Sequence, residues 1–133
     1  LDFAAGMLTI ARERAQMHRV AQRCSFVLGD FLTYPMPDRF DYAVVMGFMD
    51  YVRDPRPVIE RVLGITRWRA FFSFPVAGGL LAWQRQLRYR KRCDLFLYRY
   101  DRIHSLLSQI GAPFSIESIG RDFFVTLEPK SST

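Results

Sequence analysis

Three acidic residues stand just beyond apolar stretches of the sequence. Asp2 lies at the start of the chain, Asp30 shortly follows the apolar run 24–28, and Asp50 shortly follows the apolar segment 40–46. An ionised carboxylate only accepts hydrogen bonds, so it can hold a hydroxyl or an amine, and beside a reactive group it can take up a proton. Simpler roles also remain open: a solvated terminal acid for Asp2, a turn former for Asp30, and a helix cap or solvated acid for Asp50.

The elements that carry these acids alternate between helix and strand patterns. Apolar residues recur at helical spacing from about Ala5 to Arg19. Before this helix, Leu1-Asp2-Phe3 resembles the tail of a strand, and after it the apolar run from Cys24 to Leu28 predicts a short strand. The segment from Phe40 to Met46 is apolar almost throughout, which predicts a central parallel strand covered on both faces.

The second half of the chain continues the alternation. Asp54 and Pro55 offer a helix start, and Gly111 offers a left-handed helix end. The predicted elements are a helix to about Ile65, a strand from Trp68 to Phe74, a basic helix from near Leu80, a helix capped by Asp101, and a hairpin of Phe114 to Ile119 with Phe123 to Leu127.

This order predicts an α/β protein with a doubly wound, mostly parallel sheet and an antiparallel hairpin at the end of the chain. Ligands of such sheets bind outside the carboxyl ends of the strands. The residues expected there are Asp2, Asp30, the stretch 46–51 and the stretch 73–77.

Length and composition favour one folded domain. The chain has 133 residues, of which 50% are hydrophobic and 24% charged, and these values exclude a disordered or collagen-like chain. We expect a domain over residues 1–128 and a polar tail over 129–133, in a cytoplasmic protein without a membrane span. Cys24 and Cys93 show no metal-ligand spacing with His18 or His104, so no metal site is predicted.

The strand ends resemble the later part of a class I S-adenosylmethionine-dependent methyltransferase, a Rossmann-like family with a terminal antiparallel hairpin. The matching segments follow one another in the family's order. They are Asp2-Phe3-Ala4-Ala5-Gly6, Val27-Leu28-Gly29-Asp30-Phe31, Phe40-Asp41-Tyr42-Ala43-Val44-Val45-Met46-Gly47, Tyr51-Val52-Arg53-Asp54-Pro55 and Gly120-Arg121-Asp122-Phe123-Phe124-Val125.

The resemblance implies a function and a cofactor site. S-adenosylmethionine would be the cofactor, and a methyl group would pass to a small, aromatic or lipophilic acceptor, as in the O-methyltransferases of quinone precursors or magnesium porphyrin. Asp2 would bind the ribose, with Phe3 beside it as a further cofactor-binding residue, and Asp30 would face the adenine amine. Phe31 and Met46 would line the pocket unless they belong to the core.

Methyl transfer needs alignment more than acid–base chemistry, because the sulfonium is already activated. A base is useful if the acceptor is a phenol, and its polar candidates are Asp50, Tyr51 and His104. No residue among them is assigned as the catalytic group, and His104 is also compatible with a plain surface position.

The sequence departs from the family in one respect. The family's first strand and glycine-rich loop have no counterpart, and no G-x-G occurs anywhere in the chain. Because glycine lets the backbone close around the cofactor, we expect a fragment that is inactive and binds cofactor poorly by itself.

The basic helix leaves an alternative open. Arg85, Arg88 and Arg92 could lie on an anionic membrane, cover the active site as a lid, or form a solvated face. The alternative function is therefore a non-catalytic Rossmann-like module that binds a membrane surface or a protein through this helix. Nucleic-acid binding is disfavoured, because the exposed aromatic residues needed for base stacking are not evidently interleaved with a run of charges that tracks a groove.

Overall fold

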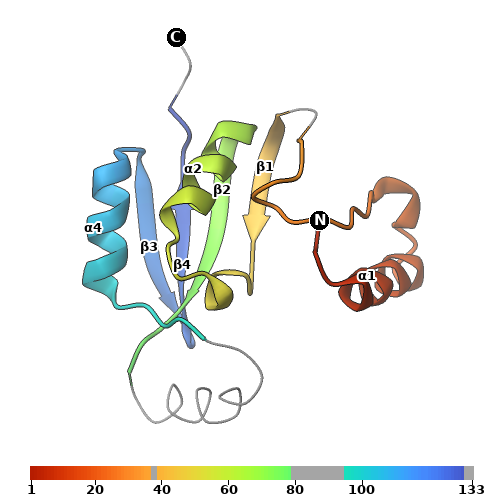
Figure 1. The fold of residues 1–133 in the computed structure, drawn as a ribbon, viewed down its shortest axis with the longest axis horizontal. Coiled ribbons are helices and arrows are strands. Elements are labelled where there is room, and N and C mark those ends of the chain that lie inside the picture. The colour runs from red at the N-terminus through yellow and green to blue at the C-terminus, as the bar shows by residue number, and fades with distance from the viewer. Residues whose placement is uncertain (37–38, 79–94, 131–133) are drawn as a thin grey trace. The chain divides into compact units, whose positions relative to one another are not determined.

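The computed structural model describes residues 1–36, 39–78 and 95–130 (Figure 1). The chain divides into two compact units, Leu1–Pro37 and Asp38–Thr133.

The first unit consists of helix α1 (Ala5–Met17), the short 3-10 turn η1 (Ala21–Arg23) and one parallel bridge between Asp2 and Leu28. The helix agrees with the prediction. The strand predicted over residues 24–28 was wrong in extent, because only the bridge forms. The bridge is formed by two backbone hydrogen bonds: Asp2 N–H donates to Val27 O and Gly29 N–H donates to Asp2 O, each at 3.0 Å.

The second unit is built on a four-stranded sheet in the order β1-β2-β4-β3. Strand β1 runs parallel to β2, while β4 is antiparallel to both β2 and β3. The α/β class and the terminal hairpin are thus confirmed. The strands are β1 (Phe40–Val45), β2 (Thr66–Pro75), β3 (Phe114–Ile119) and β4 (Asp122–Leu127).

Strand β1 corrects one expectation. It was predicted to be central, yet within the described sheet it lies at an edge, and Tyr42 and Val44 are exposed. An apolar run shows that a segment prefers the pleated conformation, but it does not show how many neighbours the strand has.

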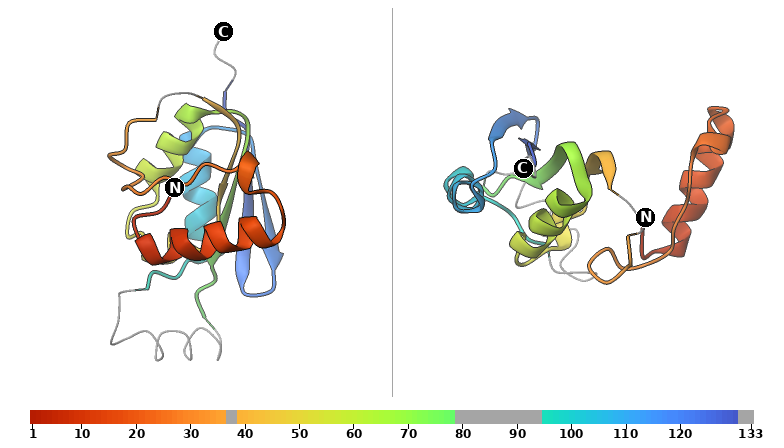
Figure 2. Two further views of the ribbon diagram at one scale, coloured as in Figure 1. Left: turned by 90° about the vertical axis from the view of Figure 1, so that its right-hand side faces the viewer. Right: turned by 90° about the horizontal axis from the view of Figure 1, so that it is seen from above.

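Helices α2 (Arg56–Ile65) and α4 (Tyr100–Ile110) both lie on one face of this sheet (Figures 1 and 2). Their starts and ends largely follow the sequence, and Gly111 ends α4 with φ of 72° as predicted. Asp101 does not cap α4, because Arg99 holds that position and the Asp101 carboxylate contacts the Arg99 side chain at 3.4 Å. The buried side chains between helices and sheet are Val58, Ile59, Val62, Ala70, Phe72, Phe74, Ile103, Leu107, Val125 and Leu127.

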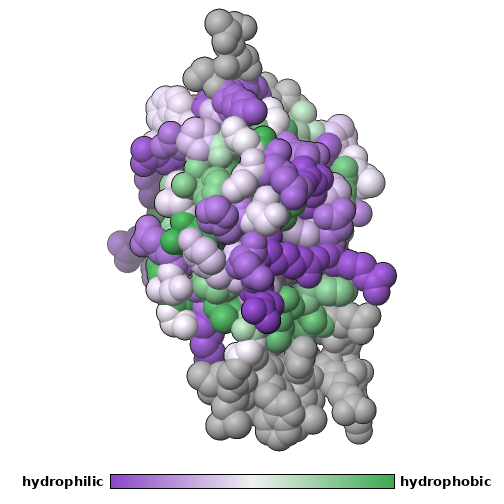
Figure 3. All heavy atoms as spheres, turned by 90° about the vertical axis from the view of Figure 1, so that its left-hand side faces the viewer, coloured by the Kyte–Doolittle hydropathy of each residue, from purple (hydrophilic) through white to green (hydrophobic). Residues whose placement is uncertain are grey.

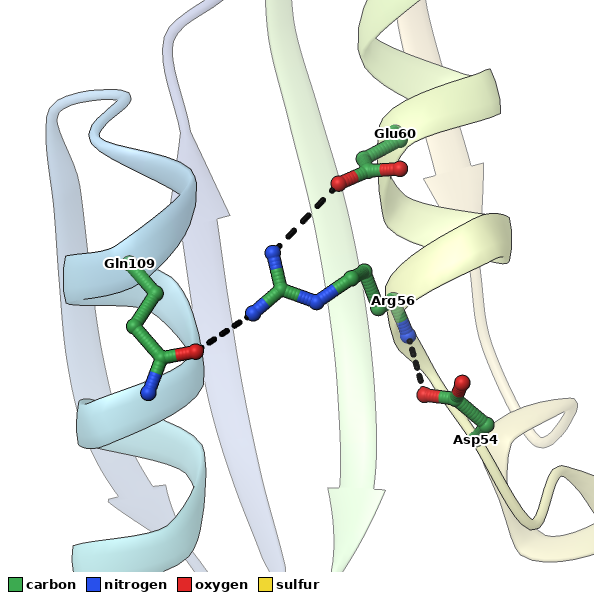
Figure 4. A network of polar contacts seen from close by, with 4 residues as sticks. All are labelled: Asp54, Arg56, Glu60 and Gln109. Atoms are coloured by element: carbon green, nitrogen blue, oxygen red, sulfur yellow. Dashed lines mark hydrogen bonds and ion pairs between the residues drawn. The ribbon is translucent and has the colours of Figure 1, made fainter.

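Arg56 links the two helices at their exposed rim (Figure 4). Its guanidinium donates to Gln109 Oε1 of α4 at 2.6 Å and to Glu60 Oε1 of its own helix at 3.4 Å. Its backbone N–H donates to Asp54 Oδ1 at 3.2 Å, which satisfies one free donor at the helix start. The polar rim thereby holds α2 and α4 side by side.

The opposite face of the sheet carries a row of aromatic side chains. Tyr42, Phe71 and Phe124 stack across three strands with ring-centroid separations of 6.4 and 6.0 Å, and Trp68 meets Tyr42 edge-on at 5.4 Å. Tyr42 and Trp68 are more than half exposed. By contrast, the surface seen from the side of α4 is mostly hydrophilic (Figure 3).

The basic helix predicted from near Leu80, with Arg85, Arg88 and Arg92, lies outside the described residues. Among the helices that the structure does describe, none has the length and apolar character needed to span a bilayer.

Candidate functional site

The first unit brings Asp2 and Asp30 to one end of a parallel pairing. Asp2 is bridged to Leu28, and Asp30 follows Leu28 after a single glycine. Asp2 is part of the bridge and Asp30 lies two residues beyond it, so both acids are near the carboxyl end of the parallel pairing, the end at which ligands of parallel sheets bind.

Local hydrogen bonds fix the conformation of both carboxylates. Asp2 Oδ1 accepts the N–H of Ala4 at 2.7 Å, and Asp30 Oδ1 accepts the N–H of Leu32 at 2.9 Å. An ionised carboxylate offers about four acceptor positions, so one such bond leaves capacity for a ligand. The turn-forming role and the binding role that the sequence left open are therefore compatible.

Gly29 stands between the bridge and Asp30 in a crowded position. A Cβ atom built on it would approach Cδ2 of the Tyr34 ring to 2.8 Å, closer than side chains tolerate. The N–H of Tyr34 also donates to Asp30 O at 2.8 Å. The absence of a side chain at Gly29 thus leaves room for the Tyr34 ring when the turn that begins at Asp30 closes. The two predicted aromatic neighbours differ, since Phe3 is exposed and Phe31 is half-buried.

In the second unit, the carboxyl end of β1 turns at Gly47. This glycine has a φ of +66°, which favours glycine over other residues, and its N–H donates to Ser73 Oγ of β2 at 3.0 Å. Met46 precedes the turn with its side chain exposed. The ends of β1 and β2 are thereby held together where the sequence predicted a binding edge.

The 3-10 turn η2 (Met49–Tyr51) follows and carries two of the predicted catalytic candidates. Asp50 is buried, whereas Tyr51 is half exposed, and Met49 is fully buried beneath them. The backbone carbonyl of Asp50 accepts the N–H of Phe96 at 2.8 Å.

His104, the third candidate, lies elsewhere in this unit. Its ring stacks on Tyr100 at 5.9 Å and meets Phe114 edge-on at 5.4 Å, in an exposed position on α4. This is the surface position that the sequence also allowed. Among the described residues, no three His, Cys, Asp or Glu side chains gather as metal ligands would.

Tyr98 was missed by the sequence reasoning. It is only 1% exposed, and its hydroxyl contacts the carbonyl oxygens of Met49 and Val52 at the two ends of η2. Burial raises the pKa of Tyr98 to about 12, helped by Asp50 and Asp54 and opposed by Arg102. The hydroxyl therefore keeps its proton and remains a donor at neutral pH. The one sequence signal that could have pointed to Tyr98 is its position directly after the apolar run Leu95-Phe96-Leu97.

The strands and helices define an α/β protein, and acidic residues stand at or after the ends of its strand segments. Residues 1–74 match the family model described as methyltransferase domain. Because the match covers more than half of the chain, the protein belongs to this methyltransferase domain family. No curated protein matches the chain in sequence.

Solved structures share the fold. An O-methyltransferase family protein from Burkholderia thailandensis is 16% identical, with a TM-score of 0.80 over 99% of this chain and 43% of its own. Magnesium protoporphyrin IX methyltransferase from Synechocystis, solved with bound SAH, is 12% identical, with a TM-score of 0.70 over 96% and 62%. A possible histamine N-methyltransferase from Thermotoga maritima is 12% identical, with a TM-score of 0.63 over 86% and 69%. The chain thus spans 43% and 62% of the first two proteins.

Proposed function

We propose that the chain is part of an S-adenosylmethionine-dependent methyltransferase that acts on a small, aromatic or lipophilic acceptor. The family match over residues 1–74 carries this proposal, because it contains Asp2, Asp30, Met46 and Asp50. The similar folds of an O-methyltransferase family protein and a magnesium protoporphyrin IX methyltransferase support it.

The residues at the first unit's edge fit the cofactor. Asp2 lies in the parallel bridge and Asp30 two residues beyond it, and each carboxylate uses one described bond to a backbone N–H. Their remaining acceptor positions suit the ribose hydroxyls and the adenine amine, both of which donate hydrogen bonds. The cofactor, when bound, supplies an activated methyl group on its sulfonium.

The protein's own contribution to this reaction is positioning. Rate is gained by aligning the acceptor with the methyl carbon and sulfur, so no catalytic triad is needed. Asp50 and Tyr51 are the proposed groups on the acceptor side, because they follow the carboxyl end of β1. For a phenolic acceptor, either one would help to remove the proton.

Calorimetric titration with S-adenosylhomocysteine tests the cofactor site. The chain should be measured both by itself and within the full open reading frame of its gene. We expect micromolar affinity in the binding-competent form, weakened at least about tenfold by Asp2→Asn or Asp30→Asn, because each change removes a charged acceptor. Glu13→Gln, an exposed acid on α1 in the same unit, is the matched control. No binding at millimolar ligand in either form would contradict the proposal.

The alternative, a non-catalytic module that uses its basic helix, receives no support from the family match or from the similar folds. Flotation with anionic vesicles tests it directly. If changing Arg85, Arg88 and Arg92 to Gln leaves flotation unchanged, the membrane role is excluded.

A further inference from the structure

Tyr98 makes an unusual connection at the carboxyl end of the sheet. Its hydroxyl oxygen lies 3.3 Å from the carbonyl oxygen of Met49 and 2.5 Å from that of Val52. These two carbonyls stand at the beginning and just beyond the end of η2, and the N–H of Val52 donates to the carbonyl of Met49 at 3.2 Å. One buried phenol therefore contacts both ends of the turn.

Tyr98 is itself held by contacts of its ring and by bonds of its backbone. Its ring packs edge-on against Phe74 of β2 at 5.1 Å, and the Arg102 guanidinium of α4 lies over it at 5.5 Å. Its backbone N–H donates to Pro75 O at 2.8 Å, and its carbonyl accepts the N–H of Ala77 at 2.7 Å. The side chain cannot shift without disturbing the end of β2 or the start of α4.

The turn held in this way carries the acceptor-side candidates. Asp50 and Tyr51 are its central and last residues, and a second bond, from Phe96 N–H to the Asp50 carbonyl, ties the same turn to the segment that contains Tyr98. Short 3-10 turns have poor hydrogen-bond geometry by themselves, so outside bonds decide how firmly they keep their shape.

We propose that Tyr98 is a positioning residue, which holds η2 so that Asp50 and Tyr51 face the methyl acceptor in a fixed arrangement. This inference rests on the proposed function for its acceptor, but the holding of the turn stands on the contacts alone. A positioning role of this kind affects acceptor binding and alignment, and leaves cofactor binding in the first unit unchanged.

Two variants separate this role from a general loss of stability. Tyr98→Phe keeps the ring and removes only the hydroxyl, and Tyr100→Phe removes an exposed hydroxyl two residues away. Amide hydrogen exchange is read at Tyr51 and Val52, with Val125 in the buried part of β4 as the reference for global unfolding. We expect Tyr98→Phe to speed exchange at Tyr51 and Val52 about fivefold, as the loss of one hydrogen bond predicts, with a smaller change at Val125. Tyr100→Phe should change none of the three.

Steady-state kinetics then tests whether Tyr98 affects the acceptor. The assay uses the form of the protein in which methyl transfer is detected. Tyr98→Phe should raise the acceptor KM or lower kcat about fivefold, while the affinity for S-adenosylhomocysteine stays within twofold of wild type.

The outcomes distinguish the two proposals. A wild-type protein that binds no S-adenosylhomocysteine overturns the proposed function, and the exchange result still decides whether Tyr98 holds the turn. If the wild type is active but Tyr98→Phe leaves the acceptor kinetics unchanged, or speeds exchange equally at Val125, the positioning role is overturned.

Discussion

The two faces of β2 show how differently adjacent residues of one type are used. Phe72 is fully buried beneath α2 and α4, whereas Phe71, its neighbour in sequence, faces the other way and joins the half-exposed aromatic row with Tyr42 and Phe124. The two side chains have the same volume and the same strand propensity. The covering helices, and not the residue type, set what each contributes to stability.

The largest expected effect compares these two residues directly. Phe72→Ala should lower the free energy of unfolding by about 4 kcal/mol, because it leaves a cavity in a closed core, and Phe71→Ala by about 1 kcal/mol. Urea unfolding of both variants measures the difference. Equal losses would show that the aromatic face is as well covered as the helix face.

The next effect concerns Tyr98, which packs on Phe74 at the end of the covered face. Burial raises its pKa to about 12 from 10.0. Below pH 10 both folded and unfolded states keep the proton and stability is complete. Between pH 10 and 12 the unfolded state loses its proton first, so stability falls as pH rises, by about 2 kcal/mol at pH 11.5.

Urea unfolding at pH 9 and pH 11.5 measures this loss. Tyr98→Phe, which cannot ionise, corrects for all other titrating groups. A loss of equal size in both proteins would contradict a buried, protonated Tyr98.

A smaller effect is expected at the polar rim of the covered face. Arg56→Met keeps much of the apolar stem but removes the bonds to Gln109 and Glu60, and should cost about 1 kcal/mol. Glu60→Gln, which weakens only the exposed pair within α2, should cost less than half as much. If the two variants lose the same stability, the link to α4 contributes nothing.

The smallest effect lies on the open face. Arg69 of β2 and Glu128, the residue after the end of β4, make a 3.1 Å contact, and both side chains are about half exposed. A double-mutant cycle with Arg69→Gln and Glu128→Gln should give a coupling near 0.5 kcal/mol that fades in high salt. A salt-independent coupling well above 1 kcal/mol would mean that this face is shielded from water.

Much of the fold followed from local patterns. Pro55 marked the start of α2, Gly111 marked the end of α4, and helical spacing marked α1, because each depends on backbone preferences within a few residues. The edge position of β1 and the shortening of the strand at residues 24–28 to one bridge did not follow. The strands that pair with one another lie far apart in sequence, and an apolar run does not show which strands will be its neighbours.

The candidate site followed in part for the same reason. Asp2 and Asp30 could be expected at one edge, because parallel segments end together. Their roles in binding remain predictions. Tyr98 could not be found, because its function depends on carbonyl groups more than forty residues earlier in the chain, at Met49 and Val52.

The backbone bonds of Tyr98 to Pro75 O and Ala77 N–H have a consequence for engineering. They pair Tyr98 with Val76 in a one-residue parallel bridge, so the main chain at position 98 has a task that is independent of its side chain. A redesign of this position can vary the ring but cannot use proline, which lacks the N–H that Pro75 O accepts.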